Sequence, residues 1–328
     1  MQVIIPLAGK GTRLRPHTHL VPKPLLKVAG RPVMDWVMDR LEGLDVSEMI
    51  FITGHLKDQV EAYARSRYRW PSRFIEQKVQ DGTAGAVHLA RPHVKEPVLI
   101  IFVDTVFEAD LTLINRTDAD GIIWAKEVED YQRFGVVVTD KDGFMTRIVE
   151  KPKEPISKLA NIGLYYIRDT DALWRGIDHV LQSPANRGEY FLTDAFQHMI
   201  EHGKRILTAE VGGWYDCGTR DAILETNHTL LKKGSAGHPA LPDSVTIREP
   251  VFVEEGAVVE RSTIGPNVTI ERDSRVVDCR LEHTIIGRHC ELRGVSLSQS
   301  LLGDYVQVRD VSGTASLGDH AELHGVPD

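Results

Sequence analysis

Cysteine is scarce in this sequence: its 328 residues include only Cys217, Cys279 and Cys290, with no C-x-x-C pair. This excludes a disulfide-stapled scaffold, and we expect three reduced, structural thiols. Long apolar runs are also missing, since the best one, 98–103, falls far short of the roughly 18 residues that a membrane helix needs. No basic stretch precedes the short apolar run at the N-terminus, so we expect no secretory signal and a cytoplasmic protein.

Positive charge is in deficit as well, because 39 Lys and Arg face 47 Asp and Glu, for a net charge of −8. A nucleic-acid binder would normally present a basic face, so the composition argues against one. An anionic small molecule would have to be held by local donors and a metal. The length predicts about two domains, and 42% hydrophobic with 26% charged residues excludes collagen and wholesale disorder.

Up to about residue 230, short apolar strands alternate with amphipathic segments. The expected strands are 2–8, 48–54, 73–77 and 98–104. The expected helices are 32–44, 58–68 and 82–92. This alternation is typical of the α/β class, with a Rossmann-like, mixed and mostly parallel sheet covered by helices.

The later part of the chain carries an imperfect repeat, in which an aliphatic residue and a glycine are followed by a second aliphatic. The matching segments are 263–270, 285–292, 301–308 and 316–323. This spacing resembles hexapeptide-repeat, left-handed parallel β-helices, with small residues at the corners; an antiparallel sandwich is the alternative. We expect a first domain over 1–230, a Gly- and Pro-containing linker over 231–245 and a β-helix over 246–328.

The opening segment has the features of a phosphate-binding loop. A strand runs into Gly9-Lys10-Gly11-Thr12-Arg13, where glycines allow a tight turn whose N–H groups can cradle an anion. It is not the dinucleotide fingerprint, because Leu14 stands where a third glycine is needed. A second cation follows in Pro22-Lys23-Pro24.

G-x-G-T-R-L-x-P followed by P-K-P-L resembles the signature of the sugar-1-phosphate nucleotidyltransferases, also called NDP-sugar pyrophosphorylases. The resemblance covers about residues 1–230, and longer family members carry a β-helical tail. It implies that Arg13 grips the β- and γ-phosphates of a nucleoside triphosphate and that Lys23 neutralises charge at the reacting phosphates. The backbone cradle would be formed by Leu7, Ala8, Gly9, Gly11 and Thr12.

The same resemblance places Gln77 against a thymine or uracil edge, with Gly82 and Thr83 completing the nucleotide site. It also implies a Mg²⁺ ion held by Asp104, at the end of an apolar strand, and Asp216, in W-x-D-x-G-T. The family usually has glycine where this chain has Val103, which leaves the local loop geometry open.

A third group of residues is expected at the sugar 1-phosphate. In this resemblance Gly135 lets the sugar lie against backbone, Glu150 accepts hydrogen bonds from its hydroxyls, and Lys151 binds its phosphate. Asn161 and Trp214 complete this sugar-phosphate set, whereas Asp194 is read as a structural acid.

The predicted enzyme therefore condenses dTTP or UTP with a sugar 1-phosphate, glucose 1-phosphate favoured, to an NDP-sugar and pyrophosphate. Arg13, Lys23, Asp104, Lys151 and Asp216 are the expected catalytic residues. We also expect a homo-oligomer, a dimer or tetramer, that binds neither membrane nor nucleic acid.

Three other interpretations stay open at this point. One is a guanylyltransferase acting on GTP and mannose 1-phosphate, and another is a non-catalytic regulatory homologue. The third is a bifunctional enzyme whose β-helix transfers an acetyl group with a base such as His283 or His289.

Overall fold

The structure is a computed structural model that describes residues 1–186 and 188–325. Its packing divides the chain into two units. The sheet unit consists of Met1–Gly9 and Val37–Trp214, and the solenoid unit combines Lys10–Trp36 with the chain from Tyr215 onward. The opening loop and its two cations, Arg13 and Lys23, therefore belong to the unit that contains the repeats.

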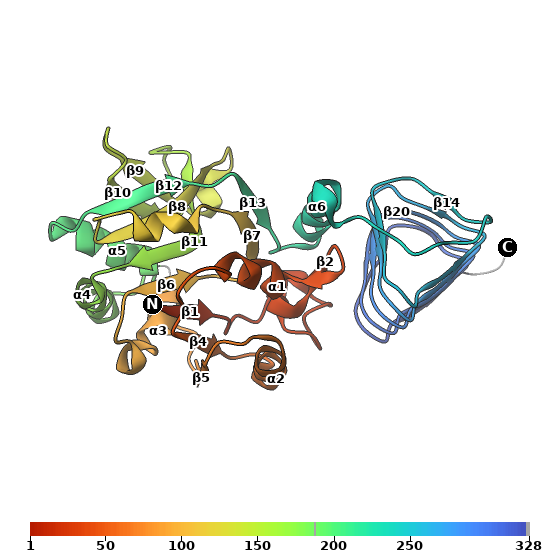
Figure 1. Ribbon diagram of the computed structural model, residues 1–328, viewed down its shortest axis with the longest axis horizontal. Helices are drawn as coiled ribbons and strands as arrows, with labels where there is room; N and C mark the ends of the chain where they lie inside the picture. The colour runs from red at the N-terminus through yellow and green to blue at the C-terminus, as the bar shows by residue number, and fades with distance from the viewer. Residues whose placement is uncertain (187, 326–328) are drawn as a thin grey trace. The chain divides into compact units, whose positions relative to one another are not determined.

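The sheet unit is built on a mixed sheet whose described strands run in the order β10-β9-β11-β6-β1-β4-β5, with β8 beside β11 and β12 beside β8 (Figure 1). β1, β4, β5 and β6 are parallel, whereas β11 is antiparallel to β6 and β8. This confirms the predicted α/β class. The strands are β1 (Gln2–Pro6), β4 (Glu48–Thr53), β5 (Ser72–Glu76), β6 (Val98–Ile101), β8 (Gly121–Glu127), β9 (Gly135–Thr139), β10 (Met145–Glu150), β11 (Leu159–Ile167) and β12 (Ile206–Glu210).

Helices pack on this sheet through apolar residues at helical spacing. In α4 (Thr170–Gln182), Leu173, Ile177 and Val180 are buried in the same core as strand residues, and Asp169 caps the helix by accepting from the Ala172 N–H at 2.9 Å. The other helices are α1 (Val33–Met38, shared by both units), α2 (Lys57–Arg67), α3 (Thr83–His88) and α5 (Leu192–Glu201). The short strands are β7 (Thr105–Glu108) and β13 (Gly213–Asp216, also shared by both units), and the 3₁₀ turns are Asp39–Leu41, Arg91–His93, Leu111–Asn115 and Tyr131–Arg133.

The solenoid unit begins with the opening segment and continues through α6 (Arg220–Leu230) into the repeats. Before α6 it holds the 3₁₀ turns η1 (Thr12–Leu14) and η2 (Lys23–Leu25) and the hairpin β2 (Lys27–Val28) with β3 (Arg31–Pro32). A π-helical turn, Leu231–Ser235, follows α6.

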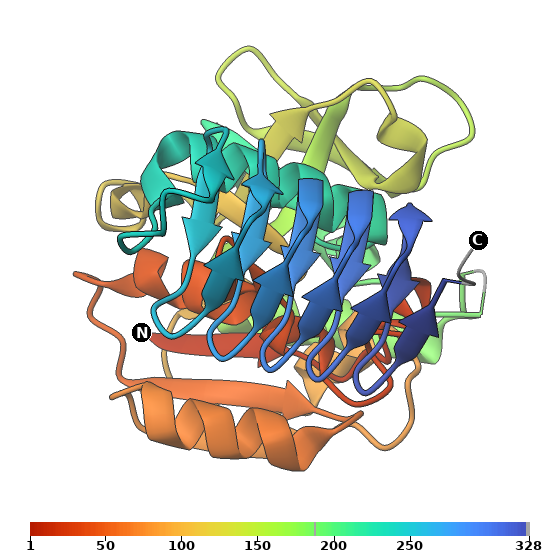
Figure 2. The same cartoon turned by 90° about the vertical axis from the view of Figure 1, so that its right-hand side faces the viewer.

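The repeats form a left-handed β-helix, as predicted. Figure 1 shows its coils end-on as triangles, and Figure 2 shows successive strands stacked side by side in parallel. Its strands are β14 (Thr246–Ile247), β15 (Val251–Val253), β16 (Val258–Glu260), β17 (Thr263–Ile264), β18 (Val268–Ile270), β19 (Arg275–Val277), β20 (Arg280–Ile286), β21 (Glu291–Arg293), β22 (Ser296–Leu302), β23 (Gln307–Arg309), β24 (Ser312–Gly313), β25 (Ser316–Leu317) and β26 (Glu322–His324). The final residues of the predicted range, 326–328, lie outside the described residues.

The register confirms most of the repeat alignment and corrects one part of it. Ile286, Leu302 and Leu317 stack on successive coils, as segments 285–292, 301–308 and 316–323 predict. Segment 263–270 is displaced by one side of a coil, since Ile270, not Ile264, pairs with Ile286. Each side of a coil repeats the same six-residue pattern, so a sequence alignment can slip by one side.

The corners of the β-helix are only partly occupied by small residues. A side chain on Gly287 would start 2.5 Å from the Gly303 carbonyl oxygen, so this corner does need glycine. Two residues on, however, His289, Tyr305 and His320 take left-handed conformations with φ of 54°, 60° and 60°, and their rings stack outside the coil. Bulk is tolerated there because it points away from the core.

All three cysteines are buried thiols, as predicted. Cys279 and Cys290 lie in the apolar core of the β-helix. No helix in the described part of the chain has the length and apolar character to cross a bilayer.

Candidate active site

The opening loop of the solenoid unit folds back on itself around Gly11. This residue is left-handed, with φ 61° and ψ 35°, and its carbonyl accepts a hydrogen bond from Thr18 Oγ1 at 2.8 Å. A Cβ on Gly11 would stand 2.9 Å from Thr18 Cγ2 and 3.3 Å from Lys23 Cβ. Two of the residues expected at the triphosphate, Gly11 and Lys23, therefore lie near each other.

Lys23 begins the short turn η2, whose backbone is restricted on both sides. Pro22 is extended at the N-cap, Pro24 is buried within the turn, and the Leu26 N–H donates to the Lys23 carbonyl at 3.2 Å. The backbone that carries the lysine is thus held in one conformation.

Arg13 and Asp216 meet at a second glycine of the solenoid unit. A Cβ on Gly218 would lie 2.8 Å from Asp216 Oδ1 and 3.4 Å from Arg13 Nη2. The Gly218 N–H donates to Asp216 Oδ1 at 2.7 Å, and Thr226 Oγ1 donates to the Asp216 carbonyl at 2.7 Å. These bonds orient Asp216 at the start of α6, where Thr219 is the N-cap.

In the sheet unit, Leu7, Ala8 and Gly9 follow β1 at its carboxyl end. The Leu7 N–H bonds to the Ile52 carbonyl at 2.7 Å, and the Ala8 carbonyl accepts from Gln80 Nε2 at 2.7 Å. The latter bond joins the end of β1 to the loop that carries Gln77. Gln80 was not among the predicted residues, because a lone surface glutamine carries no sequence signal.

Gln77, Gly82 and Thr83 lie in one loop entering α3. Gln77 is buried, and its Nε2 donates to Asp81 Oδ1 at 3.0 Å and to the Gly82 carbonyl at 3.3 Å. Gly82 has φ 123°, and a Cβ there would stand 2.4 Å from the Tyr190 carbonyl oxygen. Thr83 Oγ1 accepts from the Leu192 N–H at 2.9 Å, which ties the loop to the start of α5.

Asp104 lies in the turn between β6 and β7, at the carboxyl end of a buried parallel strand. Val103, which replaces the family's usual glycine, is buried, and it is not among the residues with positive φ. The turn therefore does not require glycine.

The predicted sugar-phosphate residues converge most closely around Gly135. Asn161 Nδ2 donates to the Gly135 carbonyl at 2.9 Å, and Thr193 Oγ1 donates to Glu150 Oε2 at 3.1 Å. A Cβ on Gly135 would stand 2.3 Å from Asn161 Nδ2, 2.8 Å from Glu150 Oε2 and 3.1 Å from Thr193 Cγ2. Residues from β10, β11 and α5 thus surround Gly135 of β9 so closely that any side chain at this position would collide with them.

Lys151 follows β10 in a left-handed conformation, with φ 45°, that is uncommon for a residue with a side chain. Its Nζ lies 3.7 Å from Glu150 Oε1 and 5.2 Å from the centre of the Phe191 ring. Burial raises the pKa of Glu150, while the nearby charge of Lys151 opposes that rise. The pair places a carboxylate and an ammonium group side by side at one edge of the sheet.

Trp214, the remaining predicted residue, packs edge-on against Phe134 with ring centres 4.9 Å apart. Because Phe134 precedes Gly135, Trp214 supports the same strand end. Three further residues of this cluster were not predicted: Thr193, Phe191 and Tyr165, whose hydroxyl donates to Asn161 Oδ1. Thr193 lies in α5, directly before Asp194, and burial raises the pKa of Asp194.

The donor chemistry suits a hard cation. Asp104 in the sheet unit and Asp216 in the solenoid unit each offer carboxylate oxygens, a ligand type that Mg²⁺ takes together with water and substrate phosphates. Among residues 1–186 and 188–325, no group of three or more His, Cys, Asp or Glu side chains is arranged to hold a metal.

Residues 2–233 match the family described as nucleotidyl transferase. A glucose-1-phosphate thymidylyltransferase of Streptomyces antibioticus is 27% identical over 356 residues, covering 98% of this chain and 99% of its own. The UTP–glucose-1-phosphate uridylyltransferase AglF of Haloferax volcanii is 32% identical over 221 residues, covering 65% of this chain and 89% of its own.

The bifunctional protein GlmU of Methanococcus aeolicus is 33% identical over 268 residues, or 79% of this chain. The match covers 62% of that relative and 61% of its Methanocaldococcus jannaschii counterpart, so this chain spans less than two thirds of their length. Among solved structures, a UDP-glucose pyrophosphorylase complexed with UDP-glucose shares the fold, with a TM-score of 0.64 and 23% identity over 71% of this chain and 98% of its own.

Proposed function

The chain belongs to the nucleotidyl transferase family, and on that premise we propose that it condenses a nucleoside triphosphate with a sugar 1-phosphate to give an NDP-sugar and pyrophosphate. The observation that carries the proposal is the convergence around Gly135 of Glu150 and Asn161, with Lys151 beside Glu150. This arrangement offers hydrogen-bonding groups for hydroxyls next to a cation for a phosphate.

The reaction needs no side-chain nucleophile, because the sugar 1-phosphate supplies one. Its phosphate oxygen attacks the α-phosphorus in line, and a new P–O bond forms as the bond to the β-phosphate oxygen breaks. The electron pair of that bond leaves with pyrophosphate. The protein's part is to position the two substrates and to neutralise their charge.

Three cations carry out this neutralisation in the proposal. Arg13 and Lys23 act on the triphosphate, and Lys151 acts on the phosphate of the sugar. A preorganised group aimed at transition-state charge contributes about 3–4 kcal/mol, or a hundredfold or more in rate. The fixed backbone around Lys23 and the left-handed conformation of Lys151 favour such preorganisation.

We propose the two substrates from Glu150 and Gln77 and from the names of two relatives. Glu150 accepts hydrogen bonds from the sugar hydroxyls, and the names of two relatives support glucose 1-phosphate as the sugar phosphate. The Gln77 oxygen can accept from the N3–H of uracil or thymine, whereas its amide nitrogen already donates to Asp81 and Gly82. The names of the relatives from Haloferax volcanii and Streptomyces antibioticus support UTP or dTTP.

Asp104 and Asp216 are the ligands that we propose for Mg²⁺, which when bound screens the negative charge of the two substrates. We further propose a homo-oligomer, a dimer or tetramer, as the working form.

The test is pyrophosphate release in the presence of Mg²⁺, measured for dTTP, UTP, GTP, ATP and CTP with several sugar 1-phosphates. Release with dTTP or UTP and glucose 1-phosphate is the expected result. Release with GTP and mannose 1-phosphate would keep the reaction and reverse the substrate assignment, and no release in any combination would contradict the proposal. Consumption of acetyl-CoA with an amino-sugar phosphate would assign a second reaction to the β-helix.

A further inference from the structure

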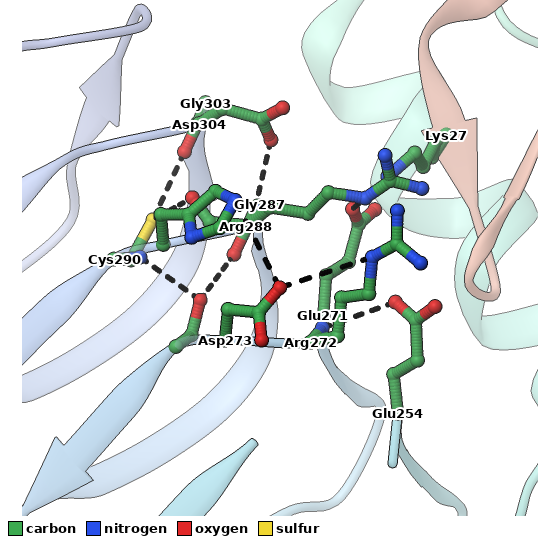
Figure 3. Close-up of polar contacts among 12 residues, drawn as sticks. Lys27, Glu254, Glu271, Arg272, Asp273, Gly287, Arg288, Cys290, Gly303 and Asp304 are labelled. Carbon is green, nitrogen blue, oxygen red and sulfur yellow. Dashed lines mark hydrogen bonds and ion pairs between the residues drawn. The ribbon is translucent and has the colours of Figure 1, made fainter. Parts of the chain in front are cut away.

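The β-helix holds a buried carboxylate that the proposed reaction does not use. Glu271 follows β18, and its side chain is 2% exposed. Its Oε2 pairs with Lys27 Nζ, and Arg288 Nε lies 3.5 Å from the same oxygen. Figure 3 shows the carboxylate facing both cations. Lys27 belongs to the opening segment, only four residues after Lys23.

This buried ion pair is not explained by a contribution to the unfolding free energy alone. Removing two charges from water carries a penalty that can exceed their mutual attraction, and an apolar pair of similar volume is often equally stable. A buried ion pair is better suited to fixing one segment against another. Burial raises the pKa of Glu271 to about 7 even though Lys27 opposes the rise, so this carboxylate lies where charge is costly.

The link from Lys27 to Lys23 is short and stiff. The turn η2 is closed by the bond from the Leu26 N–H to the Lys23 carbonyl, and the Val33 N–H donates to the Leu26 carbonyl at 2.9 Å. Prolines flank Lys23 on both sides. A displacement of Lys27 would therefore be transmitted to Lys23.

Other contacts of the solenoid unit hold the turn of the β2–β3 hairpin, which begins with Lys27. Asn227 Oδ1, on α6, accepts from the Ala29 N–H at 2.9 Å and from Thr269 Oγ1 at 2.8 Å. Gly30 lies against the Phe252 ring, which a Cβ would approach to 2.3 Å. Asn227 and Phe252 thus fix the hairpin, and Glu271 fixes its connection to η2.

We propose that Glu271 is a positioning residue, which holds Lys27 and thereby keeps Lys23 directed at the triphosphate. The catalytic part of this inference rests on the proposed function. The β-helix then takes part in turnover as the support of the opening segment that carries Lys23.

The first experiment compares three full-length variants by steady-state kinetics and urea unfolding. Glu271→Gln keeps the shape and removes the charge, and we expect kcat to fall by about 10-fold to 100-fold with an unchanged KM for the sugar 1-phosphate. Lys27→Met/Glu271→Met replaces the ion pair by an apolar pair, and should recover the unfolding midpoint but not kcat. Asp278→Asn, which breaks an exposed ion pair with Arg261 in the same β-helix, should match the wild type.

Two kinetic outcomes would overturn the inference: an unchanged kcat in folded Glu271→Gln, or a double variant that recovers kcat together with stability. The second would show that Glu271 matters only for stability.

Amide hydrogen exchange tests the positioning without relying on activity. The Leu25 and Leu26 amides bond within η2, and their exchange should be roughly tenfold faster or more in Glu271→Gln than in the wild type. Unchanged exchange would overturn the inference. If the wild type released no pyrophosphate with any substrate pair, the proposed function would fail while this exchange measurement still decided the positioning.

Discussion

At the scale of the single residue, one added methyl group at Gly135 should lower the catalytic efficiency strongly. A methyl group there would collide with Asn161 Nδ2 and Glu150 Oε2, both of which are fixed by other bonds. We expect Gly135→Ala to lower kcat/KM for the sugar 1-phosphate by about 100-fold or more. Gly237→Ala, where a Cβ meets nothing within 4 Å, is the matched control. Wild-type kinetics in folded Gly135→Ala would remove this cluster from the site.

Lys151 and Lys153 allow a second comparison between two lysines of the same loop. Lys151 lies beside Glu150 and Phe191, whereas Lys153 is exposed. We expect Lys151→Met to lower kcat/KM for the sugar 1-phosphate by about 100-fold, because the phosphate loses its cation, and Lys153→Met to leave it unchanged. Steady-state kinetics with varied sugar 1-phosphate measures both. Equal effects of the two substitutions would refute a specific role for Lys151.

At the scale of the element, the opening segment, residues 10–36, is held by contacts that no pattern in the sequence predicts. His17 is buried, and its Nε2 lies 3.0 Å from Ser316 Oγ on β25. Its neighbour Pro16 lies close to Gly318, where a Cβ would approach Pro16 Cβ to 3.1 Å. The segment 10–36 is thus packed into the repeats at several coils.

His17 makes this packing sensitive to acid. Burial, with a smaller contribution from the charge of Arg220, lowers the pKa of His17 from 6.5 to about 4. As the pH falls through this interval the unfolded chain takes up the proton first, so the unfolding free energy should decrease by up to about 3 kcal/mol between pH 6.5 and pH 4. Urea unfolding of His17→Gln should show a weaker pH dependence than the wild type. The exposed His19→Gln should retain the wild-type dependence, and an identical profile for all three proteins would contradict the assignment.

At the scale of the whole molecule, the sequence predicts elements that follow a short-range pattern, but it does not predict contacts between residues that only the fold brings together. Four strands (β1, β4, β5, β6) and three helices (α1, α2, α3), together with the β-helix, were predicted because each follows a short-range pattern. Gly135, Glu150, Lys151 and Asn161 were predicted together through a family motif. Thr193 was missed, as was the pairing of Lys27 with Glu271, which are 244 residues apart, because nothing in the local sequence links such positions.

Because the opening segment packs against the repeats, we expect that removing the repeats destabilises this segment. Ending it after residue 245 removes Phe252, Thr269, Glu271 and Ser316, the partners of the opening segment and of Asn227. We expect a shortened chain in which 10–36 is cleaved rapidly by protease and turnover falls by about 100-fold or more. Limited proteolysis with mass spectrometry, alongside the pyrophosphate assay, measures both. Full activity in the shortened chain would show that the repeats are dispensable.

The most direct test of the central claim follows the oxygen atoms of the phosphate. The nucleoside triphosphate is incubated with glucose 1-phosphate that carries ¹⁸O in its non-bridging phosphate oxygens, and both products are analysed by mass spectrometry. If the sugar phosphate oxygen attacks the α-phosphorus, all of the label stays in the NDP-sugar and the pyrophosphate is unlabelled. Label in the pyrophosphate, or an NDP-sugar that has lost part of it, would contradict the mechanism.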